Sequence, residues 1–163
     1  MAVDLQAHHE IRQLALRYCH AWLMRDDAMM AALWDRADAP APKPDLDAYW
    51  VDALLPRWGA LGTTVLHVTN HLIELDGDTA EGRVYCLAQL DRGAELVEQS
   101  IVYEDRYVRR DGRWLFAVRR HLLWFGEGRA NPLDQPDADW PRSQVGRGTV
   151  PAELTPFRPR PGA

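Results

Sequence analysis

The stretch TVLHVTNHLIELDGDTAEGRVY, residues 64–85, decides the fold. Residues on both sides of Asp76-Gly77 are rich in β-branched and apolar types, and an Asp-Gly pair suits a two-residue type I′ turn between antiparallel strands. The stretch therefore predicts a β-hairpin. Its first strand carries His67 and His71, and alternate residues of its second strand are small.

The same pattern continues toward the C-terminus. The sequence predicts four strands, at residues 63–75, 79–90, 96–109 and 113–124. The segments between them carry turn signals: DGD (76–78), RDGR (110–113) and a looser turn in DRGAE (91–95). Consecutive strands joined by short turns favour an antiparallel meander. The second half of the chain thus predicts a four-stranded antiparallel sheet.

The first half has helical spacing instead. Residues 4–24 predict an amphipathic helix with Asp4 as its N-cap, residues 28–35 a short helix, and residues 45–55 a third helix that ends before Pro56. Helices that precede an antiparallel sheet favour an α+β domain, with three N-terminal helices packed on one face of the sheet.

Length and charge narrow the class of protein. The chain has 163 residues and a net charge of −5, which suits one domain, and it has no basic run that would bind nucleic acid. It has no apolar stretch long enough for a membrane span and no signal-peptide h-region. Two cysteines favour reduced, buried thiols in a cytoplasmic protein, with one disulfide as the alternative. We expect a domain over 1–126 and a Pro/Gly-rich tail over 127–163 that packs on the domain or on a neighbouring subunit.

Counting outward from the turns gives a cross-strand register, in which we expect Arg110 opposite Arg113, Asp105 opposite Val118, Tyr103 opposite Arg120, and Gly82 opposite Tyr103. It places one set of polar side chains on the mostly apolar face that meets the helices: His67, His71, Gln99, Tyr103, Asp105 and Arg120. Polar groups on an interior face need partners, water or a ligand. The small residues of 80–88 leave volume beside the histidines, so we expect a pocket here. The opposite face is too apolar for free solvation, which predicts a homodimer through the outer sheet face.

The order of elements, with IRQLALRYCHAWLMRDD (11–27), LHVTNHLIELDGDTAEGRVY (66–85) and YEDRYVRRDGRWLFAVRR (103–120), resembles the SnoaL-like branch of the nuclear-transport-factor-2-like superfamily. The resemblance covers roughly residues 4–125. It implies a curved sheet capped by helices, forming a cone around an internal pocket. Enzymes of the superfamily include dehydratases, dehydrochlorinases, ketosteroid isomerases, polyketide cyclases and some lyases of diaryl compounds, and they typically work without cofactors.

The resemblance also implies roles for particular residues. His67 matches the strand histidine that acts as base in dehydratase-like members, Tyr18 an inward tyrosine of the first helix, and Asp105 a strand acid. Leu23 stands where the family has the aspartate that pairs with the histidine. From its position on the inner face, Arg120 is expected to stabilise charge on a substrate oxygen. A structural salt bridge between Arg120 and Asp105 is the alternative.

Further residues are expected to bind the substrate rather than to react with it. They are His71, Gln99, Tyr103, Trp22, Tyr49, Trp50 and Trp124. The aromatic members would line the pocket for a flat molecule, and ordinary core packing is the alternative for each of them.

The spacing H-x-x-x-H raises the question of a metal site. On a strand, four residues span about 13 Å, so two imidazoles cannot share one zinc ion. We therefore expect no metal site. The resemblance implies that no cofactor is needed.

These observations predict a cofactor-independent lyase, a dehydratase or a deformylating enzyme of retro-aldol type, that acts by acid/base catalysis on a small hydroxylated aromatic, diaryl or polycyclic substrate. The alternatives are an isomerase or cyclase working in the same pocket, or a binding module without catalysis, which Leu23 favours.

Overall fold

The structure is a computed structural model that describes residues 4–36 and 61–132. In these ranges the chain forms helices α1 (Leu5–Met24) and α2 (Asp27–Ala32) and strands β1 (Thr64–Asp76), β2 (Thr79–Asp91), β3 (Glu95–Arg110) and β4 (Arg113–Ala130). The strands make one antiparallel sheet in the order β1-β2-β3-β4. The expected α+β class with a four-stranded meander is confirmed.

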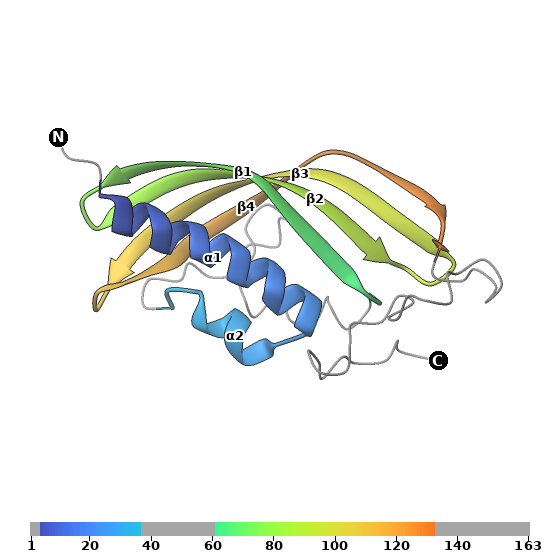
Figure 1. Ribbon diagram of the computed structural model, residues 1–163, viewed down its shortest axis with the longest axis horizontal. Helices are drawn as coiled ribbons and strands as arrows, with labels where there is room; N and C mark the ends of the chain where they lie inside the picture. The colour runs from blue at the N-terminus through green and yellow to red at the C-terminus, as the bar shows by residue number, and fades with distance from the viewer. Residues whose placement is uncertain (1–3, 37–60, 133–163) are drawn as a thin grey trace, which may run out of the picture.

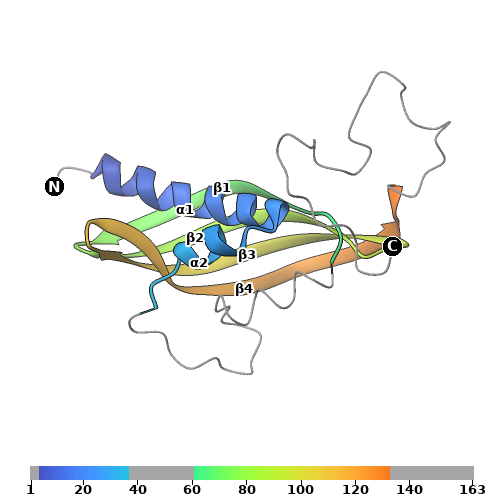
Figure 2. The ribbon, with the colours of Figure 1, turned by 90° about the horizontal axis from the view of Figure 1, so that it is seen from below.

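The sheet curves over α1, and α2 lies on the same side (Figure 1). Seen from that side, α1 runs along the sheet near β1 (Figure 2). The helix begins where the Asp4 carboxylate accepts the Ala7 backbone N–H at 3.0 Å, and it ends at Arg25, whose left-handed backbone stops the helical pattern. The Arg25 guanidinium then donates to the carbonyls of Leu61 and Gly62, which fastens the end of the helix to the chain entering β1.

The core lies between α1, α2 and the concave face of the sheet. Helix α1 contributes a buried stripe at helical spacing, and the sheet contributes alternate residues of its strands. After α2, the backbone at Leu33 and Asp35 hydrogen-bonds to Phe116, which covers part of the β4 edge. The Arg110 guanidinium also donates to the Asp35 carboxylate at 3.1 Å.

Three β-bulges interrupt the pairing of the strands, one in β1 and two in β4, the last of them beside Ser100 and Ile101. The bulge in β1 and the one beside Arg106 decide which residues of the site face the core. In β1 the pairing shifts between Val68 and His71, so that His67 pairs with Leu87 while His71 pairs with Val84. In β4 the pairing shifts beside Arg106 and Tyr107, so that Asp105 lies opposite Arg119. One extra residue in a strand reverses the alternation of its side chains. Beyond each of these two bulges, the side chains expected on the inner face of the sheet therefore lie on the outer face, and the reverse.

The sequence-based register therefore needs correction. The first turn is Gly77-Asp78 rather than Asp76-Gly77, since Asp76 pairs with Thr79. The expected pair of Asp105 with Val118 and that of Tyr103 with Arg120 are wrong, and Tyr103 pairs with His121. The β2–β3 pairing differs from the expected one by two residues, which keeps every side chain on its expected face.

Two helices rather than three are present in residues 4–36 and 61–132. The third helix, expected at 45–55, lies outside the described residues, as does most of the expected tail. Strand β4 continues to Ala130, beyond the domain end expected at residue 126. No helix in the described part of the chain is long and apolar enough to cross a membrane.

Candidate functional site

A cavity of about 260 Å³ lies between the C-terminal half of α1 and the concave face of the sheet. Most of its wall is apolar, and its polar groups come from α1, β1, β3, β4 and the turn between β2 and β3. The lining residues are Tyr18, Trp22, Leu61, Thr64, Leu66, Ala88, Leu90, Arg92, Val97, Gln99, Ile101, Tyr103 and His121. An apolar cleft with a few converging polar groups is the usual form of a small-molecule site.

Behind the cavity wall, Arg119 is buried in a cage of aromatic rings. Its guanidinium carbon lies 4.3 Å from the ring centroids of Tyr18, Tyr103 and Phe116. The Asp105 carboxylate accepts two hydrogen bonds from Arg119, at 2.8 and 2.7 Å. A two-pronged pair of this kind holds both side chains in one orientation. The pair thus places a fixed positive charge directly behind the two tyrosines of the cavity wall.

The same carboxylate orders a second set of groups. Tyr107 donates its hydroxyl proton to Asp105 at 2.6 Å, and the His71 Nε2 atom lies 3.0 Å from the Tyr107 oxygen. Because the tyrosine proton is used on Asp105, Nε2 must be the protonated nitrogen of a neutral His71. The His71 Nδ1 atom then carries a lone pair, and it is buried with no hydrogen-bond partner in the described part of the chain.

Burial controls the protonation of these groups. Loss of solvation lowers the pKa of His71 to about 4, despite the favourable charge of Asp105, so its ring is neutral at pH 7. Loss of solvation also raises the pKa of Tyr103 well above its ordinary value, which keeps its phenol protonated. For Arg119, burial opposes the charge, but the Asp105 carboxylate outweighs it and raises the pKa. The network is therefore one fixed ion pair surrounded by neutral hydrogen-bonding groups.

Four of the residues expected to form the site line the cavity: Tyr18, Trp22, Gln99 and Tyr103. Asp105 faces inward as expected, but it lies behind the wall in the ion pair with Arg119. His71 also faces inward, in contact with Tyr107 rather than among the lining residues.

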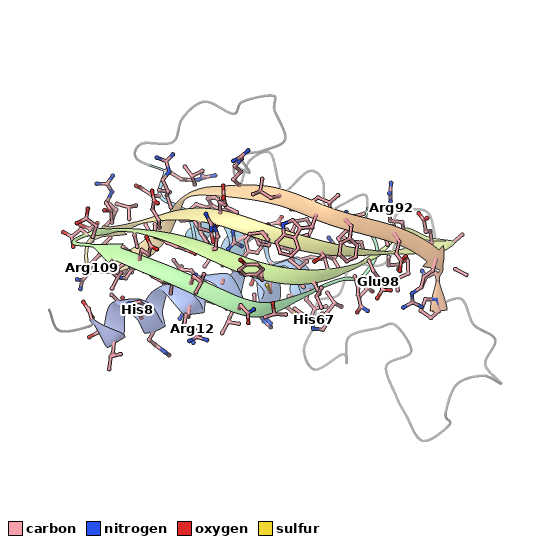
Figure 3. The ribbon with its side chains drawn as sticks, turned by 90° about the horizontal axis from the view of Figure 1, so that it is seen from above. His8, Arg12, His67, Arg92, Glu98 and Arg109 are labelled. Atoms are coloured by element: carbon pink, nitrogen blue, oxygen red, sulfur yellow. The ribbon has the colours of Figure 1, made fainter. Side chains whose placement is uncertain are left out.

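The placements expected for His67, Arg120 and Trp124 are wrong, because the bulges turn these side chains to the outer face of the sheet. His67 is exposed beside Leu87, and it is labelled on β1 in Figure 3, where the sheet lies in front of α1. Arg120 pairs with Glu104 at 3.3 Å, with both side chains solvated. Trp124 packs edge-on against Tyr85. Tyr49 and Trp50 lie outside the described residues.

Three residues that the sequence reasoning missed complete the arrangement: Tyr107, Arg119 and His121. His121 lines the cavity and packs edge-on against Tyr103, with ring centroids 5.6 Å apart. Arg119 and Arg120 are adjacent, so they point to opposite faces of the strand, and one arginine faces inward in either register. The alternation of side chains in the sequence therefore could not show which of the two it is. Within residues 4–36 and 61–132, no group of three or more His, Cys, Asp or Glu side chains is placed to hold a metal ion.

The model of the SnoaL-like domain family matches residues 3–120, and the chain belongs to this family. The fold is shared with an assigned scytalone dehydratase from Novosphingobium aromaticivorans, with 22% identity, a TM-score of 0.67, and coverage of 82% of this chain and 97% of that one. A hexachlorocyclohexane dehydrochlorinase from Novosphingobium barchaimii has 21% identity and a TM-score of 0.67, and the match covers 77% of this chain and 92% of that one. A protein of unknown function from Mycobacterium tuberculosis has 24% identity and a TM-score of 0.60, and the match covers 74% of this chain and 77% of that one. A comparison with curated protein sequences gives no match.

Proposed function

We propose that this chain is a cofactor-independent lyase that removes a small leaving group from a hydroxylated aromatic, diaryl or polycyclic substrate. One observation carries the proposal: an imidazole, His121, and two phenols, Tyr18 and Tyr103, meet on the wall of an otherwise apolar cavity. An imidazole transfers protons near neutral pH, and protonated phenols donate hydrogen bonds to oxygen.

In the proposed elimination of water, His121 removes a proton from a substrate carbon, the electron pair of that C–H bond forms the new double bond, and the departing hydroxide takes the proton back from His121. In the loss of formaldehyde, His121 removes the proton of a hydroxymethyl group, the C=O bond forms as the C–C bond breaks, and the resulting carbanion takes the proton from His121. Tyr103 stays protonated and donates a hydrogen bond to the oxygen on which negative charge develops. Tyr18 acts on the same oxygen from the helix side. Arg119 touches the faces of both tyrosine rings and supplies fixed positive charge behind them, while Asp105 holds it in place. His67 and Arg120 have no part in this scheme, since they lie on the other face of the sheet.

The comparisons support this class of reaction. The dehydrochlorinase that shares the fold is named for an elimination, and so is the assigned scytalone dehydratase. Loss of water and loss of formaldehyde both suit the proposed groups, because each moves one proton beside an intermediate that an aromatic ring can stabilise. The cavity is lined by Trp22 and several aliphatic side chains, which favours a flat, mostly apolar substrate.

The first test is mass spectrometry of purified protein incubated with hydroxylated diaryl, polyketide-like and steroid compounds, with no cofactor added. Loss of water or formaldehyde from one compound is the expected result. A product of unchanged mass with a shifted ultraviolet spectrum would replace the lyase by an isomerase or cyclase. Tight binding without turnover would identify a binding module instead.

Two matched variants test the assignment of the base. His121→Gln is expected to lower kcat by about 100-fold or more, the usual contribution of a positioned acid/base group. His67→Gln removes the same group from the outer face of the sheet and is expected to leave kcat unchanged. Equal activity in the two variants would remove His121 from the mechanism.

We also propose a homodimer formed through the outer sheet face. Leu87 and Phe125 flank Ser100 in one row across three strands, and Trp124 packs on Tyr85 beside them. The side chains of Leu87, Trp124 and Phe125 are 50%, 63% and 65% exposed. A contiguous apolar patch of this kind favours association. Sedimentation equilibrium should find a dimer in the wild type and a monomer in Leu87→Arg, and a monomeric wild type would contradict the proposal. A cytoplasmic location stays a prediction from the sequence.

A further inference from the structure

Arg92 is the one permanently charged side chain among the described residues that line the cavity. It lies in the turn between β2 and β3, and Figure 3 labels it toward the end of the sheet where these strands meet. Because Arg92 lines the cavity and is also exposed to solvent, it stands at the opening. The cavity thus has a cation at its entrance and no acidic residue in the described part of its wall.

This cation is not used by the protein itself. In the part of the chain that the structure describes, the Arg92 guanidinium has no ion pair and no hydrogen bond. The acidic residues of the same turn are directed elsewhere. The Asp91 carboxylate accepts a hydrogen bond from the Asn131 side chain at 2.8 Å, and the Glu95 carboxylate lies against Gly128 of β4. The guanidinium is therefore available to an anion from outside.

The cation is far from the reacting groups along the sheet. Tyr103 and His121 lie opposite each other on β3 and β4, whereas Arg92 precedes the start of β3. Val97 and Tyr103 both line the cavity, and the six residues of strand between them span about 20 Å. The side chains of Arg92 and His121 cover part of this distance. A ligand that reaches from one to the other is therefore elongated, with its anionic group at the end away from the reacting bond.

A carboxylate is the anion that fits this arrangement. The planar fork of guanidinium N–H groups matches the two oxygens of a carboxylate. A phosphate carries more charge and calls for further cations, but the Arg25 guanidinium beside the cavity already donates to the carbonyls of Leu61 and Gly62. Because Arg92 is partly in water, its pair with a carboxylate avoids the full desolvation cost of a buried pair.

We propose that Arg92 selects the substrate of this cavity: a diaryl acid whose carboxylate, on the ring farther from the bond that breaks, pairs with the Arg92 guanidinium at the opening. This inference rests on the proposed function, since it names the substrate class of the same cavity. The apolar rings fill the cavity, and the hydroxylated end reaches Tyr103 and His121. The reversed orientation would place the carboxylate deep in the apolar cavity beside uncharged phenols, where the loss of hydration opposes it.

Titration calorimetry of the full-length protein tests this preference without any turnover. The two probes are a hydroxybiphenyl carboxylic acid, with the hydroxyl and acid groups at opposite ends, and the corresponding neutral carboxamide. The wild type should bind the acid about 10-fold more tightly or better, the effect of a charge-assisted hydrogen bond. This advantage should shrink as salt is added. Arg92→Gln should bind the two probes equally, and Arg92→Lys should keep part of the preference, since it retains the charge without the fork.

Arg129→Gln is the matched control. It removes the same charge at the same end of the sheet, from an arginine that pairs with Glu98 at 2.9 Å and does not line the cavity. This variant should keep the wild-type preference for the acid.

Three results would overturn the proposal: no binding of the acid, equal binding of acid and amide by the wild type, or a preference for the acid that survives in Arg92→Gln. The wild-type comparison does not depend on how a variant folds. The outcome is also separate from that of the lyase test. Tight binding of diaryl acids with no turnover would contradict the lyase and keep the role of Arg92, whereas turnover of diaryl compounds with no preference for the acid would do the reverse.

Discussion

Replacing Asp105 by Asn tests the buried ion pair most directly. The substitution keeps the size of the side chain and leaves an oxygen that accepts the Tyr107 hydroxyl proton. It removes the negative charge that holds Arg119, whose side chain is 1% exposed while that of Asp105 is 0% exposed. The variant therefore leaves a buried guanidinium surrounded by aromatic rings with no counter-charge.

The size of the effect follows from the contacts. Arg119 loses its two charge-assisted hydrogen bonds to a carboxylate, at 2.8 and 2.7 Å, and its charge cannot reach water. Removing one partner of a buried pair costs about 3–5 kcal/mol, because the remaining charge is not compensated. The neighbouring residue supplies the control. Glu104 pairs with Arg120 at 3.3 Å on the outer face, where the two side chains are 37% and 49% exposed. An exposed pair of this kind contributes about 0–1 kcal/mol.

Urea denaturation followed by circular dichroism measures both variants. Asp105→Asn is expected to lower the free energy of unfolding by about 3–5 kcal/mol, and Glu104→Gln by less than about 1 kcal/mol. A similar small loss in both variants would refute the reasoning, because it would mean that Arg119 is solvated. A large loss in Glu104→Gln alone would mean that the bulge in β4 is misplaced and that Arg120 is the inward arginine.

Three further predictions concern other parts of the fold. Unfolding returns His71 to water and raises its pKa from about 4 to the ordinary 6.5, so the unfolded chain takes up the proton first. As the pH falls from 6.5 to 4, the free energy of unfolding measured in urea titrations should therefore fall by about 1–2 kcal/mol, less than the full pKa difference would give because the ring is partly solvated. The variant His71→Gln should lose most of this dependence of stability on pH. Gly82→Ala should cost about 1–3 kcal/mol in urea denaturation, since its Cβ would lie 2.9 Å from Tyr107 Cε2 and 3.0 Å from the Leu72 carbonyl oxygen; an unchanged midpoint would contradict this packing. Asp4→Ala removes the N-cap of α1 and should cost about 1 kcal/mol in thermal melts, and no loss would show that α1 does not depend on this cap.

The sequence by itself determined the class of fold. Asp4 and the apolar stripe predicted α1, and the Asp-Gly pairs predicted the places of two turns, the first of them to within one residue. Capping, helical spacing and turn chemistry depend on residues close together in the chain. Arg110 faces Arg113 as expected, since that pairing is set by the adjacent turn. The same local reasoning placed Tyr18 on the inner face of its helix. The family motifs in the sequence were also sufficient to indicate the SnoaL-like class.

Only the tertiary structure decided which side chains form the site. A β-bulge adds one residue to a strand, costs little, and leaves no clear mark in the sequence, but it reverses the faces of everything beyond it. The bulge in β1 placed His71 inside and His67 outside. The β4 bulge opposite Arg106 and Tyr107 turned Arg119 rather than Arg120 inward and brought His121 to the cavity wall. These choices depend on how each strand fits its neighbours and α1 at the same time. Loss of solvation in the packed core then kept His71 neutral and Tyr103 protonated around the Asp105–Arg119 pair. This is a property of the packed molecule rather than of any short stretch of its sequence.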